Sequence, residues 1–141
     1  MIVLDTNVVS ETLRLVPNDA VRAWFDAQVE ETLFLCAPGL AELRFGVDRL
    51  AAGAKQQWLR NEVDRLEHQE FSGRVLSFDA ATASIYGRIV AARERSGRPI
   101  GVVDGMIAAI AIQHNAVVAT RDTRDFALPD LTVVDPFGFG K

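Results

Sequence analysis

The sequence contains a single cysteine and no apolar run as long as a membrane span. One cysteine, Cys36, cannot form an internal disulfide, and with no second thiol or histidine nearby it does not indicate a zinc site. We expect it to be a small core residue. A transmembrane helix needs roughly 20 apolar residues, and the N-terminal region lacks the basic and apolar segments of a secretory signal. These absences predict a cytoplasmic protein with no membrane partner.

The sequence also lacks an excess of positive charge. It has 15 lysines and arginines against 19 acidic residues, a net charge of −4. Proteins that bind nucleic acid over an extended surface neutralise phosphates with basic side chains, so this balance argues against a DNA-binding module. It does not exclude an enzyme that contacts nucleic acid locally, because carboxylates neutralised by Mg²⁺ can hold a phosphate.

The length and apolar content are those of one domain. A chain of 141 residues that is 49% hydrophobic can bury a full core without metals or disulfides, so we expect a single domain over residues 1–141. Short β-favouring runs alternate with helical patterns, which predicts an α/β fold with a mainly parallel sheet. The expected strands are 2–4, 33–36, 75–78, 117–120 and 132–134, and the expected helices are 8–15, 20–28, 38–50, 55–71, 80–96 and 102–113.

The first expected strand ends abruptly at an acid. Asp5, Thr6 and Asn7 follow the apolar residues 2–4, and all three suit turns and helix caps rather than strands. Ligands of open parallel sheets bind at the carboxyl ends of the strands. Asp5 is therefore a candidate site residue.

Two further acids fall near expected helix starts. Glu42 follows Pro38, a residue typical of a first helical turn, so its carboxylate could reach the edge that carries Asp5. Asp104 is the one acid in the apolar stretch 102–113, and a buried charge is expensive unless it is paired or bound to a metal. The structural alternatives are a solvated helix residue for Glu42 and a capping or first-turn acid for Asp104.

The fourth expected strand is followed by a polar segment with two acids. Asp122 and Asp125 come shortly after Thr120, and either alone could be a turn residue. If these acids meet Asp5, Glu42 and Asp104 at one sheet edge, they repel one another unless a cation neutralises them. Oxygen ligands favour Mg²⁺ or Mn²⁺ over zinc.

Four segments carry a resemblance to a known family. LDTNVVSE, APGLAELRFGV, GRPIGVVDGMIAAIA and ATRDTRDF resemble the PIN-domain ribonucleases, and more narrowly the VapC and FitB toxins of bacterial toxin–antitoxin pairs. The likeness extends from about residue 1 to residue 137. It implies a three-layer α/β/α sandwich, a metal-dependent endoribonuclease activity, a homodimer and a small cognate antitoxin that binds DNA.

The resemblance also implies roles for individual residues. Asp5, Glu42 and Asp104 match the three firmest acids of the family. Relatives differ at the fourth acid, for which we favour Asp122 over Asp125. The supporting hydrogen-bonding positions of the family fall on Thr6 and Thr120.

These matches give a mechanistic hypothesis. Asp5 and Asp104 would bind a first Mg²⁺, with Glu42 and Asp122 completing its ligands or holding a second ion. Glu42 is our preferred acceptor of the proton of the attacking water. We expect the RNA to be contacted by Arg93, Arg95, Arg98 and Arg121, although the first three also suit the end of a helix, where cations are stabilised by the helix dipole.

Two other functions compete with this hypothesis. One is a metal-dependent phosphohydrolase of small phosphoesters, but residue 7 is Asn where an aspartyl-phosphate-forming phosphatase has a second Asp. The other is a non-catalytic binding module whose acids hold a structural ion. The aromatic residues Trp24, Phe25, Phe45 and Trp58 form either a dimer face, a groove for an antitoxin helix or part of the core.

Overall fold

The computed structural model describes residues 1–141 and contains one sheet of five parallel strands in the order β3-β2-β1-β4-β5. The strands are β1 (Ile2–Leu4), β2 (Leu33–Cys36), β3 (Val75–Leu76), β4 (Val117–Ala119) and β5 (Thr132–Val134). In the register of the central strands, Val3 pairs with Phe34 on one side and with Val118 on the other. The strand order reverses at β1, which places the ligand-binding crevice of such a sheet beside the ends of β1 and β4.

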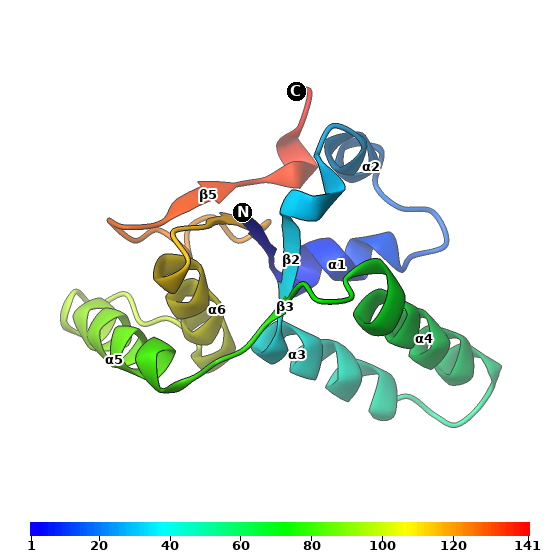
Figure 1. Cartoon of the computed structure of the whole chain (residues 1–141), viewed down its shortest axis with the longest axis horizontal. Helices are drawn as coiled ribbons and strands as arrows, with labels where there is room; N and C mark the ends of the chain where they lie inside the picture. Colours follow the sequence, from blue (N-terminus) through cyan, green and yellow to red (C-terminus); the bar gives the residue numbers. More distant parts are fainter.

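Helices cover both faces of the sheet (Figure 1). One side carries α1 (Thr6–Thr12), α2 (Asp19–Asp26), α3 (Ala37–Asp48) and α4 (Ala54–Arg65), and the other carries α5 (Ala80–Arg95) and α6 (Val102–Gln113). Side chains alternate along each strand: Leu4 belongs to the core under α1–α4, whereas Val3 belongs to the core under α5 and α6. The expected α/β/α sandwich is therefore confirmed, and its sheet is wholly parallel.

Some helix boundaries differ from those expected. The first helix ends at Thr12 and begins at Thr6, two residues earlier than expected. It begins there because Asp5 caps it by accepting a hydrogen bond from the backbone N–H of Thr6. The expected helix 55–71 ends as α4 at Arg65 and continues as a five-residue π-helix, Leu66–Glu70. The backbone N–H of Phe71 donates to the carbonyl oxygen of Leu66 at 2.8 Å, and both side chains are buried.

Side-chain caps begin two other helices, and the prediction that Cys36 is a core residue is confirmed. Asn18 caps α2, and Asp79 caps α5 in a reciprocal capping box with Thr82. Cys36 is 1% exposed in the core between the sheet and α6, and burial raises the pKa of its thiol to about 12. None of the helices combines the length and the apolar character that crossing a membrane requires.

Candidate active site

The acids lie at the carboxyl edge of the sheet because they follow strand ends or lie near the starts of helices at that edge. Asp5 and Thr120 directly follow the neighbouring strands β1 and β4, and the backbone N–H of Asp5 donates to the carbonyl oxygen of Ala119 at 2.9 Å. Glu42 lies in the first half of α3, which begins immediately after β2. Asp104 lies in the first turn of α6, the helix that runs back along the sheet before β4.

Asp5 is the most enclosed of these acids, with 3% of its surface exposed. Its carboxylate accepts hydrogen bonds from the Thr6 backbone N–H at 2.8 Å, the Asn7 side-chain amide at 3.0 Å and the Thr120 hydroxyl at 2.7 Å. Burial raises its pKa, an effect that the bonds from Thr120 and Thr6 oppose and the charges of Asp122 and Glu42 increase. The three donors hold the carboxylate in one orientation.

Thr6 connects two of the acids. Its backbone N–H donates to Asp5, and its hydroxyl donates to Oε1 of Glu42 at 2.5 Å. Glu42 is otherwise exposed to solvent. Thr6 thereby fixes one oxygen of Glu42 relative to Asp5 and leaves the other carboxylate oxygen without a donor from the protein.

Asn7 is a site residue that the sequence did not predict. Its side-chain amide donates to both Asp5 and Asp122 at 3.0 Å, and its oxygen accepts the backbone N–H of Arg121 at 3.2 Å. A neutral amide thus lies between two carboxylates that would otherwise repel. The available signal was its position two residues after Asp5 in a helical first turn, where asparagine is a poor helix former.

Asp104 differs from the other acids because no group of the protein hydrogen-bonds its carboxyl. The cap of α6 is Gly101, so the capping alternative for Asp104 is wrong, although it is a first-turn acid. Burial is the main cause that raises its pKa to about 6, and the charges of Asp5, Asp125, Glu42 and Asp122 add to it. A half-buried carboxylate among other carboxylates is unfavourable unless a cation or a proton joins it.

The two candidates for the fourth acid have different surroundings. Asp122 is bonded to Asn7, and its charge acts on both Asp5 and Asp104. The charge of Asp125 raises the pKa of Asp104 more strongly than the charge of Asp122 does. Both side chains are exposed.

The donor chemistry of the acids suits a divalent cation, although they do not form a closed ligand set. No three histidine, cysteine, aspartate or glutamate side chains converge closely enough to make a ready metal site. All the donors are carboxylate oxygens, the ligands that hard cations prefer. The absence of a hydrogen-bond donor at Asp104, beside several other negative charges, is the observation that fits a cation best.

The four expected RNA-binding arginines are not equivalent. Arg95, Arg98 and Arg121 are exposed, and the Arg121 guanidinium lies 4.3 Å from the ring centroid of Phe137. Arg93 is only 7% exposed, and its guanidinium donates to backbone carbonyl oxygens inside the protein. The expectation that Arg93 contacts RNA is therefore contradicted by its burial.

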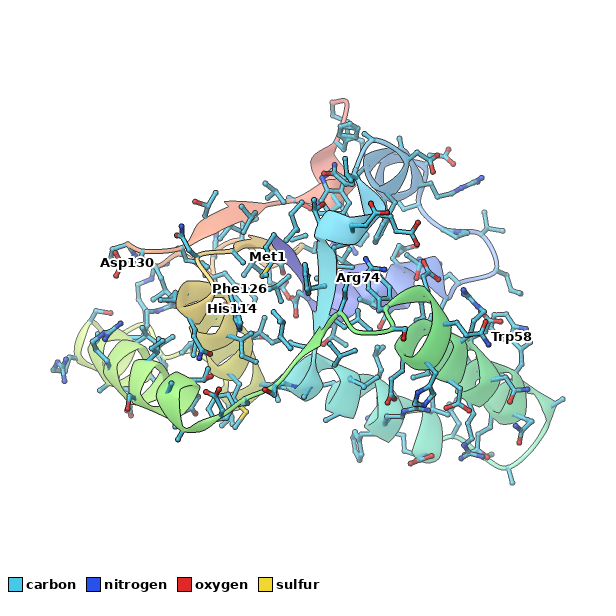
Figure 2. The ribbon with its side chains drawn as sticks, viewed as in Figure 1. Met1, Trp58, Arg74, His114, Phe126 and Asp130 are labelled. Atoms are coloured by element: carbon cyan, nitrogen blue, oxygen red, sulfur yellow. The ribbon has the colours of Figure 1, made fainter.

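A groove of about 1030 Å³ starts at the acids and runs between α1 and the α3–α4 pair. Its lining extends from Thr6 and Glu42 across Leu43 and Val47 to Trp58, which is 44% exposed and lies at the outer side of α4 (Figure 2). Of the other aromatic residues, Trp24 is buried in the core and Phe45 is 65% exposed outside the groove. The groove therefore joins an apolar surface to the acidic site.

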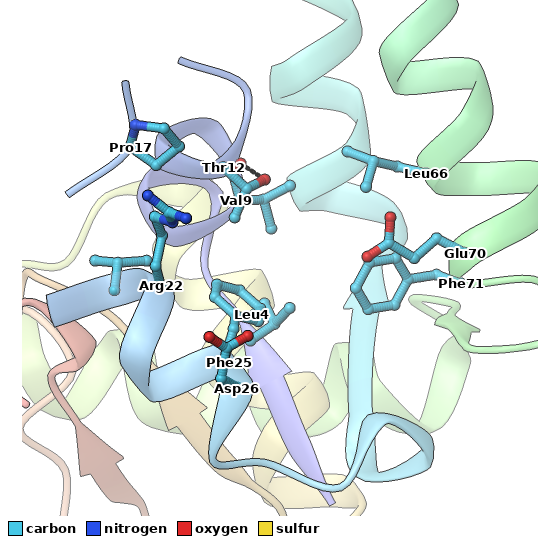
Figure 3. A pocket seen from close by; sticks show the side chains of 11 residues that line it. Leu4, Val9, Thr12, Pro17, Arg22, Phe25, Asp26, Leu66, Glu70 and Phe71 are labelled. Atoms are coloured by element: carbon cyan, nitrogen blue, oxygen red, sulfur yellow. Dashed lines mark hydrogen bonds between the residues drawn. The ribbon is translucent and has the colours of Figure 1, made fainter. Parts of the chain in front are cut away.

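A smaller hollow of about 290 Å³ lies between α1, α2 and the π-helix (Figure 3). Its floor is apolar, with Leu4 and Phe25 among the lining residues, and Arg22 and Glu70 lie on opposite sides of it. None of the candidate active-site acids lines this hollow. It is separate from the acidic edge.

Comparison with known proteins assigns the family. The PIN domain matches residues 2–130. The chain is 44% identical to VapC ribonuclease Y4jK of Sinorhizobium fredii and to toxin FitB of Neisseria gonorrhoeae, over 97% of its own length and 98% and 99% of theirs. It superimposes on FitAcB of Neisseria gonorrhoeae with a TM-score of 0.91 and 43% identity, covering 99% of this chain and 100% of that one. The chain therefore belongs to the PIN domain family, among the VapC and FitB toxins.

Proposed function

We propose that this protein is a metal-dependent endoribonuclease that acts as the toxin of a toxin–antitoxin pair and is inhibited by its cognate antitoxin. The observation that carries the proposal is the group of carboxylates at the strand-order reversal, in which Asp104 has no partner in the protein. Relatives named as a VapC ribonuclease and a FitB toxin support the same reaction and the same biological role.

Asp5 and Asp104 are the proposed ligands of a first Mg²⁺, with Mn²⁺ as a substitute, and Glu42 and Asp122 complete the ligand set. When bound, the ion supplies a Lewis acid that lowers the pKa of a water molecule and offsets charge on the phosphodiester. Asp125 is a supporting acid in this proposal, because its charge raises the pKa of Asp104 but Asn7 links Asp122, not Asp125, to Asp5.

The side chains of the protein orient the acids and accept the proton. Thr120, Thr6 and Asn7 fix the carboxylate of Asp5 through their three hydrogen bonds. Glu42 accepts the proton of the attacking water on the oxygen that Thr6 leaves free. Because Glu42 is exposed, this oxygen is accessible from solvent.

Exposed arginines near the acids are the proposed contacts to the RNA backbone. Arg121 is held beside the site by its backbone bond to Asn7 and by stacking on Phe137. Arg95 and Arg98 lie at and after the end of α5. The net charge of −4 leaves little general attraction for nucleic acid, so we expect the shape of a structured RNA to contribute to its selection.

The groove beside the acids is the proposed antitoxin site. Its apolar lining suits a segment with apolar side chains, and Glu42 at one end suits a basic residue of that segment. An arginine entering the acidic edge would compete with the metal, which gives inhibition a direct electrostatic cause. A homodimer and a small DNA-binding antitoxin remain part of the proposal.

The test compares Asp104→Asn with Asp130→Asn, a matched change at an exposed acid outside the site. Each protein is incubated with structured RNA and with a small chromogenic phosphoester, in Mg²⁺ or in EDTA. We expect RNA cleavage by the wild type and by Asp130→Asn in Mg²⁺ alone, and a loss of at least about 100-fold in Asp104→Asn. Turnover of the small phosphoester without RNA cleavage would favour the phosphohydrolase, and the absence of both would favour a binding module.

A further inference from the structure

Arg93 has an unusual environment for a cation. Its side chain is buried near the end of α5 with 7% of its surface exposed, and no carboxylate lies within ion-pair distance of it. Burying a guanidinium is costly unless its N–H groups find acceptors. The role of such a side chain is therefore sought in the groups that its hydrogen bonds connect.

The two acceptors belong to separate segments of the chain. Nε donates to the backbone carbonyl oxygen of Arg98 at 2.6 Å, and Nη1 donates to the backbone carbonyl oxygen of Asp125 at 2.8 Å. Arg98 lies in the connection that leads into α6, and Asp125 lies in the segment after β4. One guanidinium therefore joins segments that are 27 residues apart in sequence.

Each of these segments carries acids of the candidate active site. The connection containing Arg98 opens onto the first turn of α6, where Asp104 lies, and the segment containing Asp125 also carries Asp122. Neither acceptor segment is a helix or strand, so the backbone ladders of the fold do not fix them. The Arg93 side chain links the two segments directly.

The end of α5 does not itself need this side chain. The backbone N–H of Arg98 donates to the carbonyl oxygen of Arg93 at 3.0 Å, and the hydroxyl of Ser96 donates to the same oxygen at 2.9 Å. The last turn of the helix is thus closed by backbone and serine donors. The Arg93 guanidinium is available for the bridge, and its planar fork reaches two carbonyls in fixed directions, which a lysine ammonium does not.

We propose that Arg93 is a positioning residue of the acidic site, and that its bridge between the Arg98 and Asp125 carbonyls sets Asp104 at the right separation from Asp122 for both acids to share a cation. The inference rests on the proposed metal-dependent function. It assigns Arg93 no contact with RNA or with the reacting atoms.

The experiment compares Arg93→Met with Arg88→Met, an exposed arginine on the same helix. Mn²⁺ affinity is measured by calorimetry, and amide hydrogen exchange is measured without metal in segments 97–103 and 121–126. Arg93→Met should weaken Mn²⁺ binding about 10-fold or more and speed exchange in both segments, since residues that orient metal ligands typically carry that share of affinity. Cleavage should lose kcat by a similar factor with KM for RNA changed much less.

Arg93→Lys keeps the charge but should hold one carbonyl at most, so we expect Mn²⁺ affinity between those of the wild type and Arg93→Met. If Arg93→Met does not fold, the Mn²⁺ affinity of Arg93→Lys tests the positioning role instead. Wild-type Mn²⁺ affinity in either folded variant, with faster exchange confined to 97–103, would overturn the positioning role. If the wild-type protein binds Mn²⁺ but does not cleave RNA, the proposed function fails while the exchange and affinity results still test Arg93.

Discussion

At the residue scale, Asp104 lies in the candidate active site, and its ionised carboxylate destabilises the folded protein. Its pKa is about 6 in the folded protein, against 3.8 for the unperturbed group, with burial as the main cause and neighbouring acids adding to it. The folded state therefore holds this proton more tightly than the unfolded state does. The stabilising contribution is complete below the unfolded pKa and is lost as the pH rises through the folded pKa.

This linkage predicts that Asp104→Asn stabilises the metal-free protein near neutral pH. The amide carries no charge to desolvate or repel, so the free energy of unfolding should exceed that of the wild type by on the order of 1 kcal/mol above about pH 6, after discounting for solvent screening. The difference should shrink as the pH falls toward about 4. Urea denaturation in EDTA across this range measures it, and a difference that does not vary with pH would contradict the assigned pKa.

The sequence predicted the acids of the site better than it predicted the uncharged and basic side chains that hydrogen-bond around them. Asp5 and Thr120 end adjacent parallel strands, so the strand pattern brings them together. Asn7 was missed because its bonds to Asp122 and to the backbone of Arg121 depend on where a segment more than 100 residues away returns. Arg93 was misread because its place at the end of a basic helix did not indicate which way its side chain points.

At the element scale, the helices and strands that depend on local sequence pattern agree best with those predicted from the sequence. All five strands and the starts of α2 and α5 follow from apolar runs and capping residues. The π-helix after Arg65 was not predicted, because it depends on the burial of Phe71 against the rest of the core. The switch from α to π geometry is therefore a tertiary effect.

The packing of α5 against α6 predicts the effect of Gly105→Ala. A Cβ at residue 105 would lie 2.9 Å from Cε2 of Tyr86 and 3.0 Å from Cγ2 of Val90, so either these two side chains or α6 itself must shift. We expect a loss of about 1–3 kcal/mol in the free energy of unfolding, the usual range for overpacking. Asp104 is the preceding residue, so cleavage should fall as well. Thermal and urea denaturation measure the stability change.

Gly87→Ala is the matched control for this prediction. Residue 87 lies in the interior of α5, and a Cβ there has no other atom within 4 Å. Alanine should stabilise the helix by roughly 0.5–1 kcal/mol because it lowers the conformational entropy of the unfolded chain. Equal destabilisation by both substitutions would show that the close approach at Gly105 is not the cause.

At the scale of the whole molecule, the fold connects the acidic edge to a surface that a partner can reach. The parallel order β3-β2-β1-β4-β5 collects the acids at one edge, and the groove between α1 and α3–α4 begins at two residues of that edge, Thr6 and Glu42. A partner seated in the groove is therefore positioned to reach the acids. In the proposed function, the same groove would therefore account both for antitoxin binding and for inhibition of cleavage.

This arrangement predicts that Trp58 separates antitoxin binding from catalysis. Trp58 lines the groove at the end away from the acids and is 44% exposed, so Trp58→Ala should leave the core and the cleavage rate nearly unchanged. Loss of a buried interface tryptophan typically costs about 2 kcal/mol or more, which corresponds to a rise of roughly 30-fold in the antitoxin Kd. Calorimetry with the purified antitoxin measures the affinity.

Phe45→Ala provides the comparison, since Phe45 is an exposed aromatic residue outside the groove that stacks against Arg49. It should retain wild-type antitoxin affinity, and in cells co-expressing toxin and antitoxin only Trp58→Ala should arrest growth. If Phe45→Ala weakens the complex and Trp58→Ala does not, the antitoxin occupies the outer face of α3 instead. Inhibition would then require a coupling between that face and the acids other than direct entry along the groove.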